Sequence, residues 1–183
     1  MSLPIFYFGF MRKILLTLLG IVPLCLFAKG AEDMYMMWSL STHKQYYFYE
    51  QKIDKQRESS SRAFVYDITY ADTALTTTYH FSITEPQIVT IDSIAFVAGQ
   101  HRIAFLAPKQ IYIDKVKKGW LHRYEIPFPF EDLKALYQQD TPLHIIAYTN
   151  CGEMHYQISS LAKWRKISLN MQQIFSVIYL NKG

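Results

Sequence analysis

The sequence predicts a mostly β protein, between all-β and α+β, folded as an antiparallel β-sandwich or partly open barrel of about eight or more strands. Apolar and polar side chains alternate with a period of two along most of the chain after residue 30, which is typical of strands with one wet face. A helical period appears in only two segments, which predict a short helix near 131–139 and a longer C-terminal helix near 160–180.

The alternation divides the chain into strands joined by short polar intervals. It is clearest in residues 62–71 and 75–84, and the short interval around Asp72 suits a hairpin connection. Pro127 and Pro129 should end a strand before them, because proline cannot donate a hydrogen bond within a central strand. Further strands are predicted at 34–40, 44–50, 88–97, 101–107, 110–114, 120–126, 142–150 and 153–159.

The predicted turn at Cys151-Gly152 fixes how the last two strands pair. A two-residue connection there places Ala147 opposite Tyr156 on the buried side, and Tyr148 opposite His155 on the open side. The same register sets Ile145 opposite Ile158. A slip of one residue would invert the two faces.

Both predicted helices have one apolar face. Leu133, Leu136 and Tyr137 share a face of the shorter helix. We expect the apolar stripe of the longer helix to pack on a sheet. Because its charged residues are all basic, association with an anionic membrane surface is the alternative. The stripe consists of Leu161, Trp164, Ile167, Met171, Ile174 and Ile178.

Residues 11–30 carry the three parts of a secretory signal. A basic start at Arg12 and Lys13 precedes an apolar run over residues 14–28, and small residues follow for a peptidase to cleave after Gly30 or Ala28. The run is shorter than the about 18–20 residues of a membrane span. We therefore predict a signal peptide over 1–30, with translation starting at Met11, and a single β-rich domain over 31–183. The chain is then exported to the bacterial periplasm, cell surface or exterior.

Charge and cysteine content narrow the function. Three of the 19 basic residues lie in the signal, which leaves 16 basic and 15 acidic residues after residue 30, and so no basic surplus of the kind that nucleic-acid binding needs. Cys151 is then the remaining cysteine, so the hydrophobic core must hold the fold without an intramolecular disulfide. In the predicted register His155 lies beside Tyr148, which argues against a Cys151 nucleophile.

No motif in the sequence names a reaction. The six histidines lack metal-ligand spacing, and neither a Gly-x-Ser-x-Gly nucleophile motif nor a glycine-rich phosphate loop occurs. We assign no catalytic residue, no metal ligand and no cofactor. The alternative, a small periplasmic hydrolase, requires two of His101, His122, Asp92 and Asp114 to converge in one pocket.

The aromatic content is the strongest compositional signal. There are 14 tyrosines and 12 phenylalanines, and Tyr46-Tyr47-Phe48-Tyr49 puts rings on both faces of one strand. Exposed rings can stack on sugars or anchor a protein partner, although tyrosine is also simply a good strand former. We predict a non-catalytic module that binds a protein or glycan of the envelope, of open oligomeric state. Its candidate binding residues are Tyr47, Tyr49, Trp120, Tyr124, Tyr148 and His155.

Overall fold

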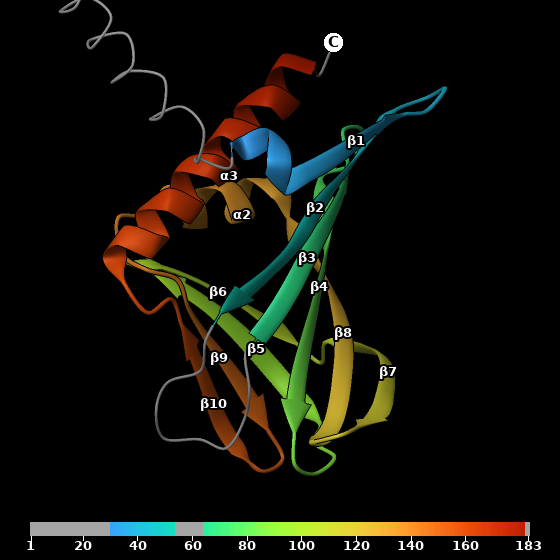
Figure 1. The fold of residues 1–183 in the computed structure, drawn as a ribbon, viewed down its shortest axis with the longest axis vertical. Helices are drawn as coiled ribbons and strands as arrows, with labels where there is room; N and C mark the ends of the chain where they lie inside the picture. Colours follow the sequence, from blue (N-terminus) through green and yellow to red (C-terminus); the bar gives the residue numbers. More distant parts are fainter. Residues whose placement is uncertain (1–29, 54–63, 182–183) are drawn as a thin grey trace, which may run out of the picture. The chain divides into compact units, whose positions relative to one another are not determined.

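The computed structural model describes residues 30–53 and 64–181, which form two antiparallel sheets, two α-helices and a short 3₁₀ helix (Figure 1). The predicted mostly-β antiparallel architecture with two helices is thereby confirmed. The two sheets stay separate, so the molecule is an open sandwich and not a closed barrel. The predicted signal peptide lies outside the described residues, apart from Gly30.

Six strands make the larger sheet, in the order β1-β2-β3-β4-β8-β7, and every neighbouring pair is antiparallel. The 3₁₀ helix, Ala31–Met34, precedes it. The strands are β1 (Tyr35–Ser39), β2 (Lys44–Ile53), β3 (Phe64–Ala71), β4 (Thr76–Glu85), β7 (Lys109–Val116) and β8 (Gly119–Pro129).

Four strands make the smaller sheet, in the order β10-β9-β5-β6, again antiparallel throughout. The chain passes from one sheet to the other between β4 and β5. It returns between β6 and β7, where Ala107 takes a positive φ of 44°. The strands are β5 (Ile91–Ala98), β6 (His101–Leu106), β9 (His144–Thr149) and β10 (Gly152–Gln157).

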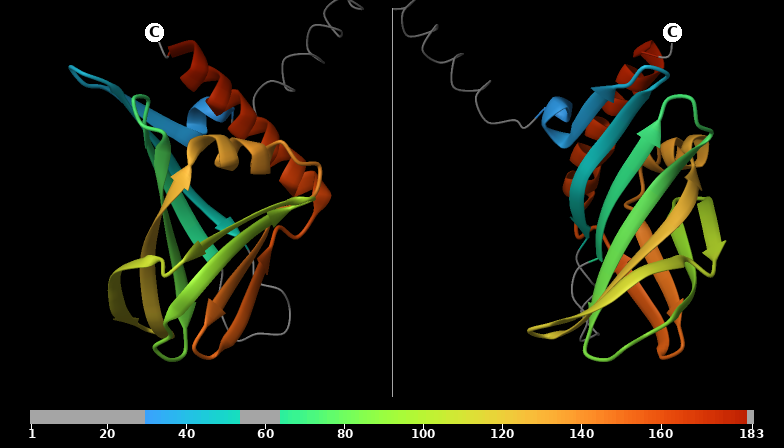
Figure 2. Two further views of the ribbon diagram at one scale, coloured as in Figure 1. Left: turned by 180° about the vertical axis from the view of Figure 1, so that it is seen from behind. Right: turned by 90° about the vertical axis from the view of Figure 1, so that its right-hand side faces the viewer.

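The two sheets lie close together at one end and splay apart at the other, where α2 (Phe130–Tyr137) and α3 (Leu161–Asn181) lie across the opening (Figure 2). Both predicted apolar helix faces point inward. Leu133, Leu136 and Tyr137 are buried, as are Trp164 and most of the stripe that follows it in α3. No helix in the described part of the chain is long and apolar enough to cross a membrane.

Aromatic rings fill much of the space between the sheets. Tyr66 stacks on Tyr79 with ring centroids 5.1 Å apart, and its hydroxyl shares a 2.8 Å hydrogen bond with that of Tyr137 in α2. Burial raises the pKa of Tyr66 to about 12, and the hydrogen bond to Tyr137 offsets part of the rise. Most of the tyrosine surplus therefore serves the core. The buried tyrosines are Tyr46, Tyr66, Tyr70, Tyr79, Tyr124, Tyr137 and Tyr156.

The expectation that the prolines end a central strand is wrong. Strand β8 continues through Pro127 and Pro129, which pair with Thr78 and Thr76 of β4. The amide of Phe130 donates to Leu75 O, so by alternation the amide positions of residues 127 and 129 point away from β4. Pairing with β7 has already ended at Glu125. The missing N–H groups therefore fall where β8 has a partner on one side only.

The predicted register of the last hairpin is also wrong. Each residue of β9 pairs with the β10 residue two positions before the predicted one. Asn150 and Cys151 form the turn, and Gly152 begins β10 with a φ of 117°. Tyr148 accordingly pairs with Glu153, and His155 with Ile146. Because a shift of two residues keeps every side chain on its face, the predicted buried side is right. Its members Ile145, Ala147, Tyr156 and Ile158 are all buried.

Candidate binding surfaces

The outer face of the larger sheet begins with an apolar ridge on the β1–β2 hairpin. The alternation sends Tyr46 and Phe48 into the core and leaves Tyr47 and Tyr49 outside, with their ring centroids 5.9 Å apart. Met36 pairs with Tyr47 on the same side, and Trp38 lies two residues further along β1. Trp38 is 46% exposed and Met36 39% exposed. We call Met36, Trp38, Tyr47 and Tyr49 the aromatic ridge.

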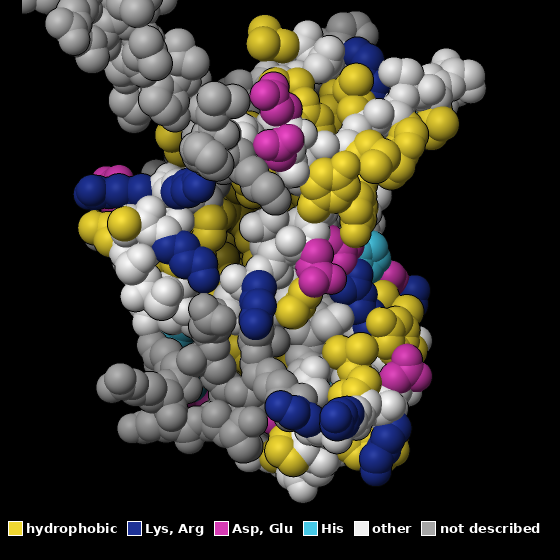
Figure 3. All heavy atoms as spheres, in the orientation of Figure 1, with side chains coloured by type: hydrophobic (Ala, Val, Ile, Leu, Met, Phe, Trp, Pro, Cys, Tyr) yellow, Lys and Arg dark blue, Asp and Glu magenta, His cyan; other side chains and the backbone are white. Residues whose placement is uncertain are grey.

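A charged cluster lies on the same face, across β3, β4, β8 and β7. The Asp67 carboxylate accepts hydrogen bonds from Arg123 and, at 3.1 Å, from His80 Nδ1. His80 Nε2 lies 3.8 Å from Glu125, whose other carboxylate oxygen accepts a 2.6 Å bond from Lys109 Nζ. We call these five residues the Asp67 cluster. Figure 3 shows acidic, basic and histidine side chains gathered beside the hydrophobic side chains of the β1–β2 hairpin.

Burial and pairing hold the Asp67 carboxylate at the centre of the cluster. Only 5% of the Asp67 side chain is exposed, and burial alone would raise its pKa, but the bonds from His80 and Arg123 outweigh that and lower it. The ridge and the cluster adjoin, because Tyr47 pairs with Thr69, which lies two residues from Asp67 on the same face of β3. Partial burial and the charge of Asp67 accordingly raise the pKa of Tyr47. The cluster therefore presents paired charges beside exposed rings.

The residue types of a nucleophilic triad occur side by side in Ser82, His80 and Asp67, but they do not have the geometry of a triad. In a triad the histidine bonds the carboxylate with one nitrogen and the nucleophile with the other. Here the second nitrogen of His80 faces Glu125, and the Ser82 hydroxyl accepts a 3.1 Å bond from Arg123 Nη1. Among the described residues, His80 is therefore not placed to take the serine proton, and these three side chains do not form a triad.

The other four predicted binding residues lie in three different settings. Tyr124 is 1% exposed on the inner face, where its hydroxyl donates to Val89 O, so its prediction as a surface binding residue is wrong. Trp120 is partly buried, with Lys115 Nζ 4.8 Å above its ring. Tyr148 and His155 lie on the outer face of the smaller sheet, where Tyr148 accepts a 3.1 Å bond from Arg102. Only Tyr47 and Tyr49 thus share one surface in the larger sheet.

The four residues of the hydrolase alternative are spread over both sheets. Asp92 and His101 are exposed on β5 and β6, and Asp114 is exposed on β7. His122 is fully buried on β8. Within the described part of the chain no hydrogen bond or ion pair joins any two of them. The convergence that a hydrolase would require is not observed there.

His122 is nevertheless an unusual core residue. Among the described residues neither ring nitrogen makes a hydrogen bond of ordinary geometry, although the backbone of Gln87 lies close to the ring; Oε1 of the buried Glu85 nearby also has no partner. Burial lowers the pKa of His122, and it outweighs the Gln87 backbone and the charge of Glu85, which both favour the protonated ring. His122 is therefore held neutral inside the fold. The burial of His122 could not be predicted from the sequence, because alternation placed His122 on a strand without indicating which face was covered.

We expect the neutral His122 to make the fold sensitive to mild acid. The unfolded chain binds a proton near the ordinary histidine pKa of about 6.5, whereas native His122 binds it only at lower pH. The free energy of unfolding should thus fall as pH drops below about 6.5, by up to about 1.4 kcal/mol per pH unit for this group. Urea unfolding between pH 7 and pH 5 measures it. His122→Phe should make the slope shallower.

We expect His144 to contribute to the pH dependence of stability that remains in His122→Phe. Burial, followed by the charge of His155, lowers the pKa of His144, so its effect on stability has the same sign as that of His122. A His122→Phe, His144→Gln double variant should thus be flatter still, while replacement of the exposed His101 by glutamine serves as the matched control. An unchanged slope in His122→Phe contradicts the assignment.

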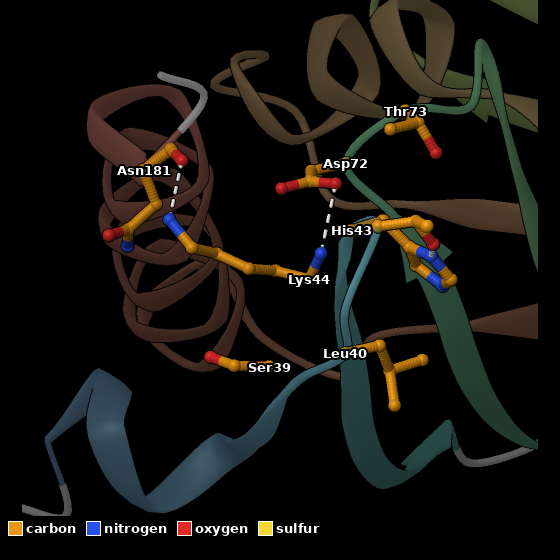
Figure 4. A pocket seen from close by; sticks show the side chains of 8 residues that line it. Ser39, Leu40, His43, Lys44, Asp72, Thr73 and Asn181 are labelled. Atoms are coloured by element: carbon orange, nitrogen blue, oxygen red, sulfur yellow. Dashed lines mark hydrogen bonds between the residues drawn. The ribbon is translucent and has the colours of Figure 1, made fainter.

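Two hollows adjoin the sheets, and the first, of about 420 Å³, is polar (Figure 4). Its charged groups, the Lys44 ammonium and the Asp72 carboxylate, each bond the backbone. Lys44 Nζ donates to the last described carbonyl of α3, at Asn181, over 2.7 Å, and the Lys44 amide donates to Asp72 at 3.0 Å. A cation at a helix C-terminus stabilises the helix dipole. The residues that line this hollow therefore serve to hold the C-terminal end of α3 in place.

The second hollow, of about 650 Å³, lies where β6 passes to β7. It is lined mainly by apolar residues, among them Phe105 and Leu106, and Leu106 is 84% exposed. Lys109 and Glu125 of the Asp67 cluster form part of its lining. Its charged side chains, Lys109 and Glu125, bond each other, and we assign the hollow no ligand.

Comparison with known proteins adds no assignment. No protein-family model, curated protein or solved structure matches this chain.

Proposed function

We propose that this protein is an exported, non-catalytic binding module of the bacterial envelope, and that it binds a protein partner through the outer face of its larger sheet. The observation that carries the proposal is the aromatic ridge beside the Asp67 cluster. Tryptophan, tyrosine and arginine are the residues that most often dominate protein interfaces, and here all three occur on one sheet face. The signal-like residues 11–30 support export.

A protein partner fits this face better than a glycan. Glycan sites combine flat rings with polar groups whose hydrogen-bonding capacity is still available, but the carboxylates of the Asp67 cluster are already paired with Arg123, His80 and Lys109. The exposed side chains of Met36 and Trp38 extend the apolar area instead. Met and aromatic residues are enriched in protein interfaces.

The test is crosslinking capture from the envelope of the native organism with the tagged full-length chain. We expect one partner at constant stoichiometry. Trp38→Ala and Tyr49→Ala should each weaken binding of that partner, once isolated, by about 2 kcal/mol or roughly 30-fold, because exposed anchors dominate such interfaces. Both substitutions should leave the unfolding free energy within about 0.5 kcal/mol of the wild type.

Leu106→Ala is the matched control, since Leu106 is 84% exposed but lies on β6 of the smaller sheet. It should bind the partner as the wild type does. Equal binding by all three variants would assign the interface to another face. Capture that depends on an envelope glycan, and survives protease treatment of the extract, would replace the protein partner with a sugar.

A further inference from the structure

The outer face of the smaller sheet carries two histidines in contact. His144 Nε2 lies 3.1 Å from His155 Nδ1, and the two rings are nearly parallel with centroids 5.2 Å apart. His144 pairs with Gln157, so the two histidines are diagonal neighbours across β9 and β10. Side chains at diagonal positions of an antiparallel pair are within reach of each other when they are long or aromatic. Both residues are partly exposed.

A third side chain determines which ring nitrogen of His155 carries the proton. His155 Nε2 lies 3.2 Å from the Glu153 carboxylate, which can only accept a hydrogen bond when ionised. The proton of a neutral His155 is therefore on Nε2, and its Nδ1 has a free lone pair directed toward His144. A carboxylate that accepts the second N–H of a histidine is the usual support of a metal-bound imidazole.

From this geometry we propose that His144 Nε2 and His155 Nδ1 chelate a divalent transition metal ion of the imidazole-binding class, Zn²⁺ or Cu²⁺, with Glu153 orienting His155. Two nitrogens 3.1 Å apart, each at a metal bond length of about 2.0–2.1 Å, subtend an angle of roughly 95–102° at the ion. That value lies between the tetrahedral and square-planar angles, which suit Zn²⁺ and Cu²⁺ respectively.

Binding requires a change of tautomer and a rotation of the rings that turns both lone pairs toward the ion. In the metal-free pair His144 donates its Nε2 proton to His155 Nδ1. When the ion takes that place, the proton moves through solvent to Nδ1 of His144, and both coordinating nitrogens are neutral. Protonation of either ring blocks the site, so affinity should fall as the pH drops through the histidine range.

The rest of the coordination shell is solvent. No group of three or more His, Cys, Asp or Glu side chains suited to a metal ion occurs in residues 30–53 and 64–181. The two rings therefore act as a surface chelate, with water in the other positions. Arg102, bonded to Tyr148, is the cation placed on the neighbouring strand β6. The bond to the Tyr148 hydroxyl does not neutralise the positive charge of Arg102, and this charge modestly opposes the binding of a metal ion.

Calorimetric titration of the purified, untagged full-length chain with ZnCl₂ at pH 7.5 tests the site. We expect one ion per chain. His144→Gln and His155→Gln should each weaken binding at least tenfold, and Glu153→Gln by about 10-fold or more through loss of support to His155. His101→Gln, which removes an exposed histidine from strand β6 of the same sheet, should bind as the wild type does.

A spectroscopic readout separates loss of ligands from loss of fold. The electron paramagnetic resonance spectrum of the Cu²⁺ complex should show nitrogen hyperfine coupling from two imidazoles in the wild type and from one in either glutamine variant. A wild type that takes up neither ion overturns the proposal. So does Zn²⁺ affinity that is equal in the wild type, His144→Gln and His155→Gln.

Discussion

Replacement of Arg123 by alanine should lower the free energy of unfolding by about 3 kcal/mol, near the lower end of the range for breaking a buried ion pair. The reason is the position of Asp67, whose side chain is only 5% exposed. Without Arg123 the carboxylate keeps only the hydrogen bond from His80 in the cluster, and an incompletely paired charge in a poorly solvated place is costly. Urea unfolding at pH 7 measures the loss.

Lys109→Ala provides the matched control. Lys109 also bonds a carboxylate of the Asp67 cluster, Glu125, at 2.6 Å, but its side chain is 75% exposed. An exposed pair contributes at most about 1 kcal/mol, so the two cations should differ in effect although both make a short contact. Equal losses in the two variants would mean that burial of Asp67 does not set the cost.

A double-mutant cycle adds a second check on the same pair. If Asp67 and Arg123 act together, the Asp67→Asn, Arg123→Ala double variant should be less destabilised than the sum of the single variants, with an interaction free energy of about 0.5–3 kcal/mol. Additive losses would place the effect of Arg123 in its contact with Ser82 instead.

Trp164→Ala should cost about 3–5 kcal/mol, the range for removing a tryptophan from a core. Trp164 is fully buried in α3, stacks on Tyr137 with centroids 5.5 Å apart, and donates from Nε1 to Gln139 O at 2.7 Å. The substitution removes the apolar contact area and leaves that carbonyl without its donor. Urea unfolding followed by circular dichroism measures the loss.

Leu169→Ala is the control within the same helix. Leu169 is 57% exposed, so its truncation should change the free energy of unfolding by no more than about 0.5 kcal/mol. A similar loss in both variants would mean that α3 is not anchored through Trp164. Because the apolar stripe is buried against the protein, any membrane contact of this helix would have to use its exposed side, which carries Arg165 and Lys166.

Much of the fold could be predicted from the period of hydrophobicity. A period of two requires a sheet with a covered and an exposed side, and the shift to 3.6 residues in the last segment requires a helix with one apolar stripe. Strand ends were less predictable. Whether β8 could pass Pro127 depended on where its neighbour β7 stopped pairing, which no local pattern encodes.

The candidate sites depended on pairing between strands that are distant in sequence. Asp67 and Arg123 are separated by 56 residues, and they meet because β4 pairs with both β3 and β8. Tyr124 shares one face of β8 with Ile126, and the second sheet and the helices cover that face. The alternation of apolar and polar residues assigns side chains to two faces of a strand. It does not show which of the two faces is covered by another layer.

The sequence by itself determined which side chains of the last hairpin share a face, and only the tertiary structure decided which of them touch. Side-chain direction repeats every two residues, so a pairing shift of two leaves Ile145 and Tyr156 buried and His155 partly exposed. The same shift exchanges the residues that face each other across the two strands. It moved His155 from a position opposite Tyr148 to one opposite Ile146 and diagonal to His144, and thereby brought together the two nitrogens at which we propose that a metal ion binds.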